Sequence, residues 1–436
     1  MRCRRQERAG ERSAPCWVAL VVAALGCTVG MMTTVVSVRA EQLQTGPRWV
    51  TAWSTSHQVL AAPAISNATV RFVARVTIPG DTIRLRFDNT LGTEPLRIGR
   101  AFVGHRVRGA LLAAGSNRPL TFGGTAEATI APGATAWSDP VALPVLAQQD
   151  LAVSLYIPGQ RVAPTQHTGA VVTSYRTADG SGDVAADESA GPFTGTVTSL
   201  WWLKSIEVQA SASSSAIAAF GDSITDGTCT TLDAHDRWED LLSVRLGLEH
   251  DLAVRAGLGA GERWHAVLNE GIGGNTLTRD GLNPAPDSPT GVERLERDVL
   301  SHHGVDTVAV FMGTNDIRRG ASANQVIAAM TTIAQRVRAA GMRVVGVTIV
   351  PRHNVPAVAG NSGWDAGKTR IRNEVNAWIR GRAAFDAVID FDRVVADASN
   401  PDLIRPAFNC GDGIHPSPRG YFEMGSALDL TLFAPR

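Results

Sequence analysis

From residue 41 to residue 210, apolar and polar residues alternate in short runs that turn-forming residues separate. Alternation is clearest at 70–76, 83–87 and 151–157. A period of two is typical of β-strands with one buried face. Many short strands at this spacing predict an all-β sandwich or jelly-roll-like domain over 41–210.

After a linker of small residues at 211–214, the period of the pattern changes, and apolar runs alternate with amphipathic helices. The expected strands are 215–220, 266–269, 307–312, 343–350 and 387–391. The expected helices are 237–246, 292–300, 323–340, 368–380 and 418–430. This alternation predicts a second domain over 211–436, with a doubly wound, flavodoxin-like parallel sheet of five strands.

The first 40 residues have a different composition from the rest of the chain. Five arginines within residues 2–12 precede an uncharged apolar run at 17–38, and the small residues Val38 and Ala40 follow. This order is typical of a secretory signal, so we expect a secreted or cell-surface protein. The apolar run is also long enough to span a bilayer, so an uncleaved membrane anchor is the alternative.

The cysteines agree with export. Three of the five lie in the leader, and only Cys229 and Cys410 follow it. An even pair in an exported protein indicates one disulfide, and two unpaired buried thiols are the alternative.

Charge and motif spacing exclude several kinds of partner. The 436 residues include 41 basic and 41 acidic side chains, so the formal net charge is zero. Nucleic-acid binding would favour a basic face, and we expect no nucleic-acid partner. The scattered histidines, His167 among them, have no metal-ligand spacing, and the glycine-rich segments lack the context of a nucleotide-binding motif. We therefore expect no metal and no cofactor.

Polar loops follow four of the five expected strands: the first, the second, the third and, after a longer connection, the fifth. They are Gly221-Asp222-Ser223, 269–275, Met312-Gly313-Thr314-Asn315-Asp316 and Asp412-Gly413-Ile414-His415. Ligands of open α/β sheets bind at the carboxyl edge of the strands. Because the four loops gather on that edge, their side chains can meet in space.

These loops supply one candidate for each part that acyl transfer requires. Ser223 is the candidate nucleophile, His415 the general base and Asp412 the group that orients the base. The candidate oxyanion donors are the backbone N–H groups of Ser223 and Gly274 and the side-chain amide of Asn315. Taken alone, a serine at a strand–helix junction is more often an N-cap, and Asp-x-x-His is more often a turn. The four loops together favour the catalytic interpretation.

The four loops resemble the sequence blocks of the SGNH/GDSL hydrolases: Gly-Asp-Ser, Gly-Ile-Gly-Gly-Asn, Gly-Thr-Asn-Asp and Asp-x-x-His. The resemblance covers about residues 215–436 and implies the fold, the ester-hydrolysing activity and the residue roles given above. Gly273 stays open as an alternative to Gly274. The β half also resembles the amino-terminal domain of bacterial members similar to xylan-cluster arylesterases and acylhydrolases, through elements such as Trp49-x-x-x-Trp53 and Ser138-Asp139-Pro140.

Three further predictions concern the neighbours of these residues. Cys229 lies six residues after Ser223, and Cys410 lies two residues before Asp412. A working triad would bring the two cysteines within disulfide range, so we predict a Cys229–Cys410 bond between the two loops. Asp222 is expected to hold its own turn through backbone hydrogen bonds, and Asp226 to cap the following helix.

Together these observations predict a secreted serine esterase that works through an acyl-enzyme. No apolar lid is evident, which favours short acyl groups, acetyl foremost, on carbohydrate or aryl alcohols. One alternative is a lysophospholipase or lipase that acts at a membrane through an uncleaved leader. The other is a glycan-binding protein with an inactive hydrolase domain. The sequence does not predict the oligomeric state.

Overall fold

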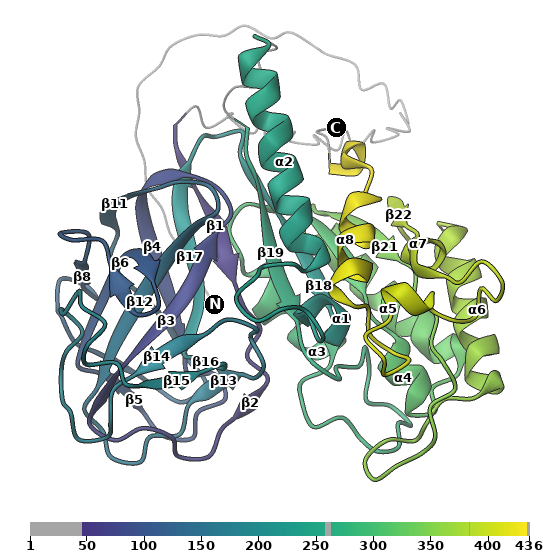
Figure 1. The fold of residues 1–436 in the computed structure, drawn as a ribbon, viewed down its shortest axis with the longest axis horizontal. Helices are drawn as coiled ribbons and strands as arrows, with labels where there is room; N and C mark the ends of the chain where they lie inside the picture. Colours follow the sequence, from purple (N-terminus) through teal and green to yellow (C-terminus); the bar gives the residue numbers. More distant parts are fainter. Residues whose placement is uncertain (1–45, 258–262, 383, 434–436) are drawn as a thin grey trace, which may run out of the picture. The chain divides into compact units, whose positions relative to one another are not determined.

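The first half of the described chain, residues 46–210, in which apolar and polar residues alternate, is rich in antiparallel β-strands (Figure 1). One sheet contains β1 (Arg48–Ser54), β17 (Leu203–Ala210), β4 (Gly80–Asp88), β10 (Thr135–Trp137) and β11 (Val141–Val145). Another contains β15 (Gly195–Val197), β14 (Ser174–Arg176), β3 (Ala68–Val76), β12 (Gln149–Ile157), β6 (Arg100–Arg108), β7 (Leu111–Leu112) and β8 (Arg118–Leu120). Shorter strands are β2 (Val59–Leu60), β13 (Thr165–His167) and β16 (Leu200–Trp201), and β5 (Leu96–Ile98) pairs with β9 (Ala128–Ile130).

This computed structural model describes residues 46–257, 263–382 and 384–433. The leader predicted at 1–40 lies outside these residues. None of the helices in the described ranges combines the length and apolar character that a membrane span requires. Residues Gln44–Arg436 form one unit, within which all contacts below lie.

Strand β3 departs from the predicted pattern of one buried face. Arg71, expected on the polar face, is completely buried. Its guanidinium lies 4.0 Å from the ring centre of Phe193 and donates to Ser154 Oγ at 2.8 Å and to the Ala110 carbonyl at 2.5 Å. These contacts allow a charged side chain to lie under the segment around Phe193, which covers the second face of the strand.

The second half contains the predicted five-stranded parallel sheet. Its strand order is β19 (His265–Gly271), β18 (Ser215–Gly221), β20 (Val305–Phe311), β21 (Arg343–Val347) and β22 (Ala387–Ile389). All four neighbouring pairs are parallel. Strand β18 is therefore an inner strand, and its carboxyl end lies between those of β19 and β20.

Alternation along β18 separates the two faces of this sheet. Ile217 and Ala219 belong to one buried cluster, with side chains of α2 (Trp238–Arg255), α7 (Phe391–Val395) and α8 (Pro418–Ser426). Ala218 and Phe220 belong to the other, with side chains of α3 (Gly291–Leu295), the π-helical segment η1 (Glu296–Leu300), α5 (Ala323–Ala339) and α6 (Ala366–Arg380). Short helical segments are α1 (Ser223–Asp226), α4 (Thr314–Arg318), η2 (Pro406–Phe408) and η3 (Leu430–Phe433).

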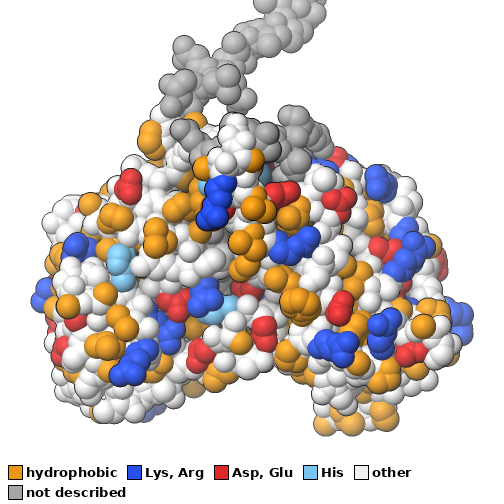
Figure 2. Space-filling view, turned by 45° about the horizontal axis from the view of Figure 1, so that its top comes forward, with side chains coloured by type: hydrophobic (Ala, Val, Ile, Leu, Met, Phe, Trp, Pro, Cys, Tyr) orange, Lys and Arg blue, Asp and Glu red, His pale blue; other side chains and the backbone are white. Residues whose placement is uncertain are grey.

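The β half and the parallel sheet share a core. Val50 of β1 belongs to the same buried cluster as Ala218 of β18, and the Thr51 N–H donates to the His303 carbonyl at 2.9 Å. On the face that Figure 2 shows, basic and acidic side chains are interspersed among apolar ones. The buried contact between the two halves brings residues of the β half close to the sheet that carries the predicted site.

Candidate active site

The turn after β18 presents Ser223 at the carboxyl edge of the sheet. A Cβ atom on Gly221 would lie 2.1 Å from Thr225 Oγ1, so only glycine allows this close turn. Asp222 is the N-cap of α1, and its carboxylate accepts the Ile224 N–H at 3.1 Å. Ser223 is thus the first residue of the helix and not its cap, and its own N–H has no intrahelical acceptor.

Ser223, His415 and Asp412 form a chain of hydrogen bonds. Ser223 Oγ lies 2.9 Å from His415 Nε2, and His415 Nδ1 lies 2.5 Å from Asp412 Oδ2. The Ser223 residue is 8% exposed, whereas the Asp412 side chain is 38% exposed. The structure therefore brings together three residues that are up to 192 positions apart in the sequence.

The loop that carries Asp412 and His415, called the base loop below, holds Asp412 through its own backbone N–H groups. The other carboxylate oxygen of Asp412 accepts the N–H groups of Ile414 at 2.8 Å and His415 at 2.9 Å. Burial raises the pKa of Asp412, but these donors and the His415 ring lower it by a larger amount. The pKa therefore lies well below its ordinary value. The carboxylate is therefore ionised at neutral pH, as a group that stabilises an imidazolium must be.

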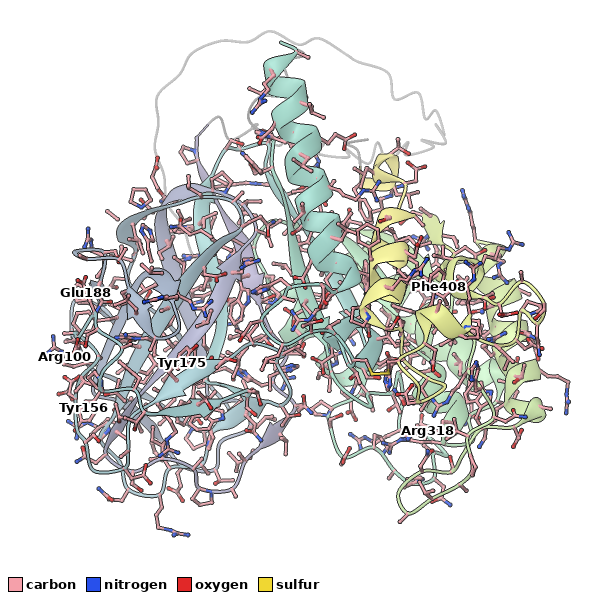
Figure 3. All side chains as sticks on the ribbon, in the orientation of Figure 1. Arg100, Tyr156, Tyr175, Glu188, Arg318 and Phe408 are labelled. Atoms are coloured by element: carbon pink, nitrogen blue, oxygen red, sulfur yellow. A yellow bond between two sulfur atoms is a disulfide. The ribbon has the colours of Figure 1, made fainter. Side chains whose placement is uncertain are left out.

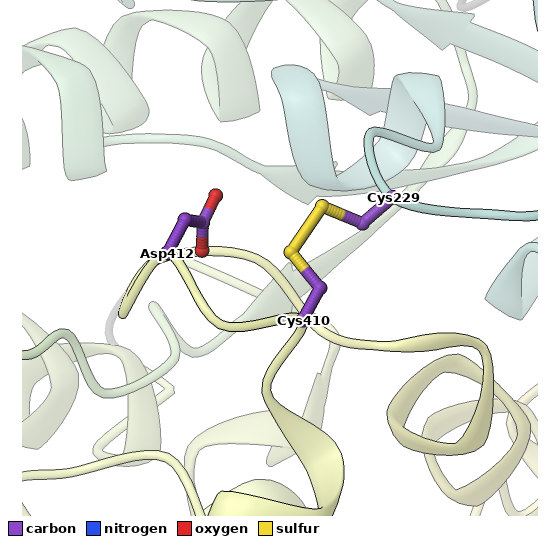
Figure 4. Close-up of side chains that lie close together, drawn as sticks. All are labelled: Cys229, Cys410 and Asp412. Carbon is purple, nitrogen blue, oxygen red and sulfur yellow. A yellow bond between two sulfur atoms is a disulfide. The ribbon is translucent and has the colours of Figure 1, made fainter.

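The base loop is closed where it leaves the helical segments. The Ser417 N–H donates to the Phe408 carbonyl at 2.7 Å, and the Cys410 N–H donates to the His415 carbonyl at 3.1 Å. Phe408 is labelled in Figure 3. The loop is also linked covalently, because Cys410 forms a disulfide with Cys229, with Cα atoms 6.3 Å apart (Figure 4). This bond joins the base loop to the segment that follows the nucleophile.

The loop after β19 distinguishes the two glycines left open by the sequence. The Gly273 N–H donates to Asp226 Oδ2 at 2.8 Å, whereas the Gly274 N–H has no hydrogen-bond partner among the described residues. Gly274 has φ +73°, and a Cβ there would meet no atom within 4 Å. The Gly274 N–H is thus the one left for a ligand. Asp226 holds this loop and does not cap the next helix, whose N-cap is Arg237.

Asn315 lies at the start of α4, a helix that the sequence analysis missed. Its Nδ2 donates to the Asn275 carbonyl at 3.0 Å, and the residue is 5% exposed. An amide nitrogen carries two hydrogens, so this bond orients the group and leaves a second N–H for a ligand. The hydrogen bond from Asn315 also joins α4 to the loop that carries Gly274.

One residue that the sequence did not predict is Arg294 of α3. It is completely buried and contacts both the nucleophile turn and the loop after β19. One terminal nitrogen donates to the Gly221 carbonyl at 2.8 Å, and Nε donates to Asn275 Oδ1 at 2.9 Å. Its other terminal nitrogen donates to Ser56 Oγ, in the β half, at 2.9 Å. The capping box at Thr290 and Glu293 marked the helix, but no sequence motif marked this arginine.

Two carboxyl groups are buried around the nucleophile turn. Burial raises the pKa of Asp222 to about 6, although the Ile224 N–H and nearby positive charges oppose this effect. Burial raises the pKa of Asp316 to about 7 against the N–H groups of Leu277 and Thr278, which donate to it. Asp316 thereby connects α4 to the loop that carries Gly274.

Cys229, Cys410 and Asp412 have candidate ligand atoms within 4.8 Å of one another. The two sulfur atoms are bonded to each other, so this group fits a disulfide beside a carboxylate and does not fit a metal site.

A parallel α/β sheet with serine, histidine and aspartate linked at its carboxyl edge is typical of a serine hydrolase. Residues 219–421 match the model of the GDSL-like Lipase/Acylhydrolase family. This part of the chain is therefore a GDSL-type acylhydrolase domain, and the protein is a carboxylic ester hydrolase.

Solved structures similar to this chain include two esterases. The M. smegmatis aryl esterase is 19% identical, with 50% of this chain and 98% of that chain covered and a TM-score of 0.39. A carbohydrate acetylesterase from Sinorhizobium meliloti is 20% identical, with 49% and 95% covered and a TM-score of 0.37. A search of curated proteins finds no match.

Proposed function

We propose that the protein is an exported serine esterase that removes short acyl groups, acetyl foremost, from carbohydrate or aryl alcohols. The observation that carries the proposal is the hydrogen-bond chain from Ser223 through His415 to Asp412. The composition of the leader supports export, and cleavage of the leader is part of the proposal. A flavodoxin-like sheet preceded by a sandwich-like β domain is the fold class that we propose with it.

In the proposed reaction, Ser223 Oγ attacks the ester carbonyl while His415 Nε2 accepts its proton. The ionised Asp412 accepts the Nδ1–H of the ring and stabilises the imidazolium. The N–H groups of Ser223 and Gly274 and the amide of Asn315 donate to the oxyanion. The imidazolium then protonates the departing alcohol, and a water molecule activated by the same histidine hydrolyses the acyl-enzyme.

The surroundings of the nucleophile support a small polar substrate. Arg352 is buried, and its guanidinium lies 5.1 Å from the ring centre of Trp364. Burial lowers the pKa of Arg352 to about 10, and the negative charges of Asp222 and Asp412 oppose this effect. Charged and amide groups around Ser223 suit an acetyl ester of a polar alcohol better than a long alkyl chain.

The test compares the wild-type protein with Ser223→Ala on p-nitrophenyl esters from acetate to palmitate. We expect hydrolysis to be fastest for the acetate and to be lost in the variant, since the nucleophile is removed. Near-full activity of the variant would refute the role of Ser223. A preference for palmitate would favour the lipase alternative, and glycan binding without turnover of any ester would favour the binding-protein alternative.

A further inference from the structure

One buried histidine connects the β half to the loop that carries Gly274. His167 is the last residue of β13 and is 4% exposed. Its Nε2 lies 2.9 Å from Asp226 Oδ1, and its Nδ1 lies 2.8 Å from the Ser56 carbonyl oxygen. The other oxygen of Asp226 accepts the Gly273 N–H at 2.8 Å. Two successive contacts therefore lead from His167 to the residue next to Gly274.

The protonation state of His167 follows from its two partners. A carbonyl oxygen can only accept a hydrogen bond, and an ionised carboxylate can only accept one, so both ring nitrogens donate. The ring is then an imidazolium paired with the Asp226 carboxylate. Burial and the nearby Arg237 lower the pKa of His167, but the charge and hydrogen bond of Asp226 raise it above its ordinary value. Such charge-assisted bonds are stronger than neutral ones.

This pair restrains the segment in which an oxyanion donor must be aimed. The Gly273 N–H is held by Asp226, and the Asn275 N–H donates to the Ile272 carbonyl at 3.1 Å. Between these two anchors, the peptide that contains the Gly274 N–H has a restricted orientation. Asp226 is also the last residue of α1, the helix that begins with Ser223, so it relates the donor loop to the nucleophile.

We propose that His167 is a positioning residue for the oxyanion loop, defined as residues 271–275, and that it acts through Asp226. The β half is thereby a part of the active site as well as a neighbouring fold. The kinetic consequence rests on the proposed function of Ser223 and Gly274, whereas the restraint on the loop does not.

A second contact between the halves provides a matched control. Gln148 Nε2 donates to Ser243 Oγ, on α2, at 2.8 Å, and among the described residues neither side chain has a hydrogen bond to the catalytic loops. Ser243→Ala removes this contact, and alanine is well tolerated there because it has a high helix propensity. A general loosening of the two halves would appear in this variant, while a specific effect on the oxyanion loop would not.

Two substitutions at His167 separate its two hydrogen bonds. The amide of glutamine reaches the place of Nε2, so His167→Gln can keep the Asp226 contact. The amide of asparagine reaches only the place of Nδ1, so His167→Asn keeps the Ser56 contact and loses Asp226. For hydrolysis of p-nitrophenyl acetate, we expect His167→Asn to lower kcat by up to about 10²-fold with little change in KM. His167→Gln and Ser243→Ala should stay near the wild-type kcat.

Amide hydrogen exchange of the peptide that contains Gly273 is the second readout, and it does not need activity. Exchange should rise in His167→Asn and in Asp226→Ala, which removes the carboxylate on the other side of the same contact, but not in His167→Gln or Ser243→Ala. The proposal is overturned if His167→Asn leaves exchange at Gly273 at the wild-type rate, whether or not Asp226→Ala raises it. It is also overturned if kcat falls equally in His167→Asn, His167→Gln and Ser243→Ala. If Ser223→Ala kept its activity, the proposed function would fail, and the exchange result would still decide the role of His167.

Discussion

The two sides of the candidate site are held in different ways. On the nucleophile side, Ser223 and Asn315 are each less than a tenth exposed, and the buried Arg294 donates to both adjoining loops. On the base side, the carboxylate of Asp412 is more than a third exposed, and a disulfide and a local turn hold its loop.

The difference follows from the positions of the two loops in the chain. The nucleophile turn leaves the inner strand β18, so neighbouring strands and the helices on both faces of the sheet surround it. The base loop leaves the short segment η2, beyond the last strand, and its residues Gly411 and Asp412 are exposed. Packing and buried hydrogen bonds can restrain the first loop, while the second requires a covalent bond and backbone turns for the same restraint.

The largest expected effect is on the exposed side of this comparison. Asp412→Asn should lower kcat by about 10⁴-fold, because an amide does not stabilise the imidazolium and does not select the required tautomer of His415. Steady-state hydrolysis of p-nitrophenyl acetate measures it. Asp397→Asn is the matched control, since Asp397 also accepts the N–H groups two and three residues further on. If both variants stay within tenfold of wild type, Asp412 serves only the turn.

The disulfide should contribute more to stability than any other single contact of the base loop. It closes 181 residues, so Cys229→Ser with Cys410→Ser should lower the free energy of unfolding by up to about 4–5 kcal/mol, through a less restricted unfolded chain. Denaturant titration measures the loss. A non-reducing digest should contain one linked peptide with both cysteines, and separate peptides would contradict the bond.

On the buried side, Asn315→Ala should lower kcat by about 10²–10³-fold, because one oxyanion donor is lost. The matched control is Asn376→Ala. Asn376 is also buried, and it bridges the N–H and carbonyl of Ile349 without touching the catalytic loops. The control should lose stability and keep kcat, measured by thermal unfolding and hydrolysis. Equal losses of kcat in both variants would remove the special role of Asn315.

The smallest expected effect is the pH dependence of the buried carboxyl of Asp316. Its pKa is about 7 in the folded protein and lower in the unfolded chain, so the folded state holds the proton more tightly. Its stabilising contribution is present in full below the ordinary pKa and is lost as the pH rises through about 7. Between pH 5 and pH 7 the free energy of unfolding of the wild type should therefore fall by about 2 kcal/mol relative to that of Asp316→Asn. Parallel stability curves for the two proteins would show that Asp316 is ionised throughout.

The local pattern of apolar residues was enough to predict that most helices and strands exist, but it did not predict where they end. The five parallel strands and the main helices were predicted, because a single period of apolar residues identifies each. Helix α2 was expected to end at residue 246 and continues to Arg255, with Leu248 and Leu252 more than half exposed. Helix α8, expected to reach residue 430, ends at Ser426. The short helix α4 was missed because five residues carry no period.

By itself, the sequence determined which residues stand at the carboxyl edge of the sheet, since strand period and loop composition are local properties. Only the tertiary structure decided which groups hold them there. Arg294 contacts Ser56 across 238 positions, and Asp226 contacts His167 across 59, so neither pairing leaves a mark in any short stretch. A buried charge is tolerated only where its partners converge on it, and that convergence exists only after the two halves of the chain have packed together.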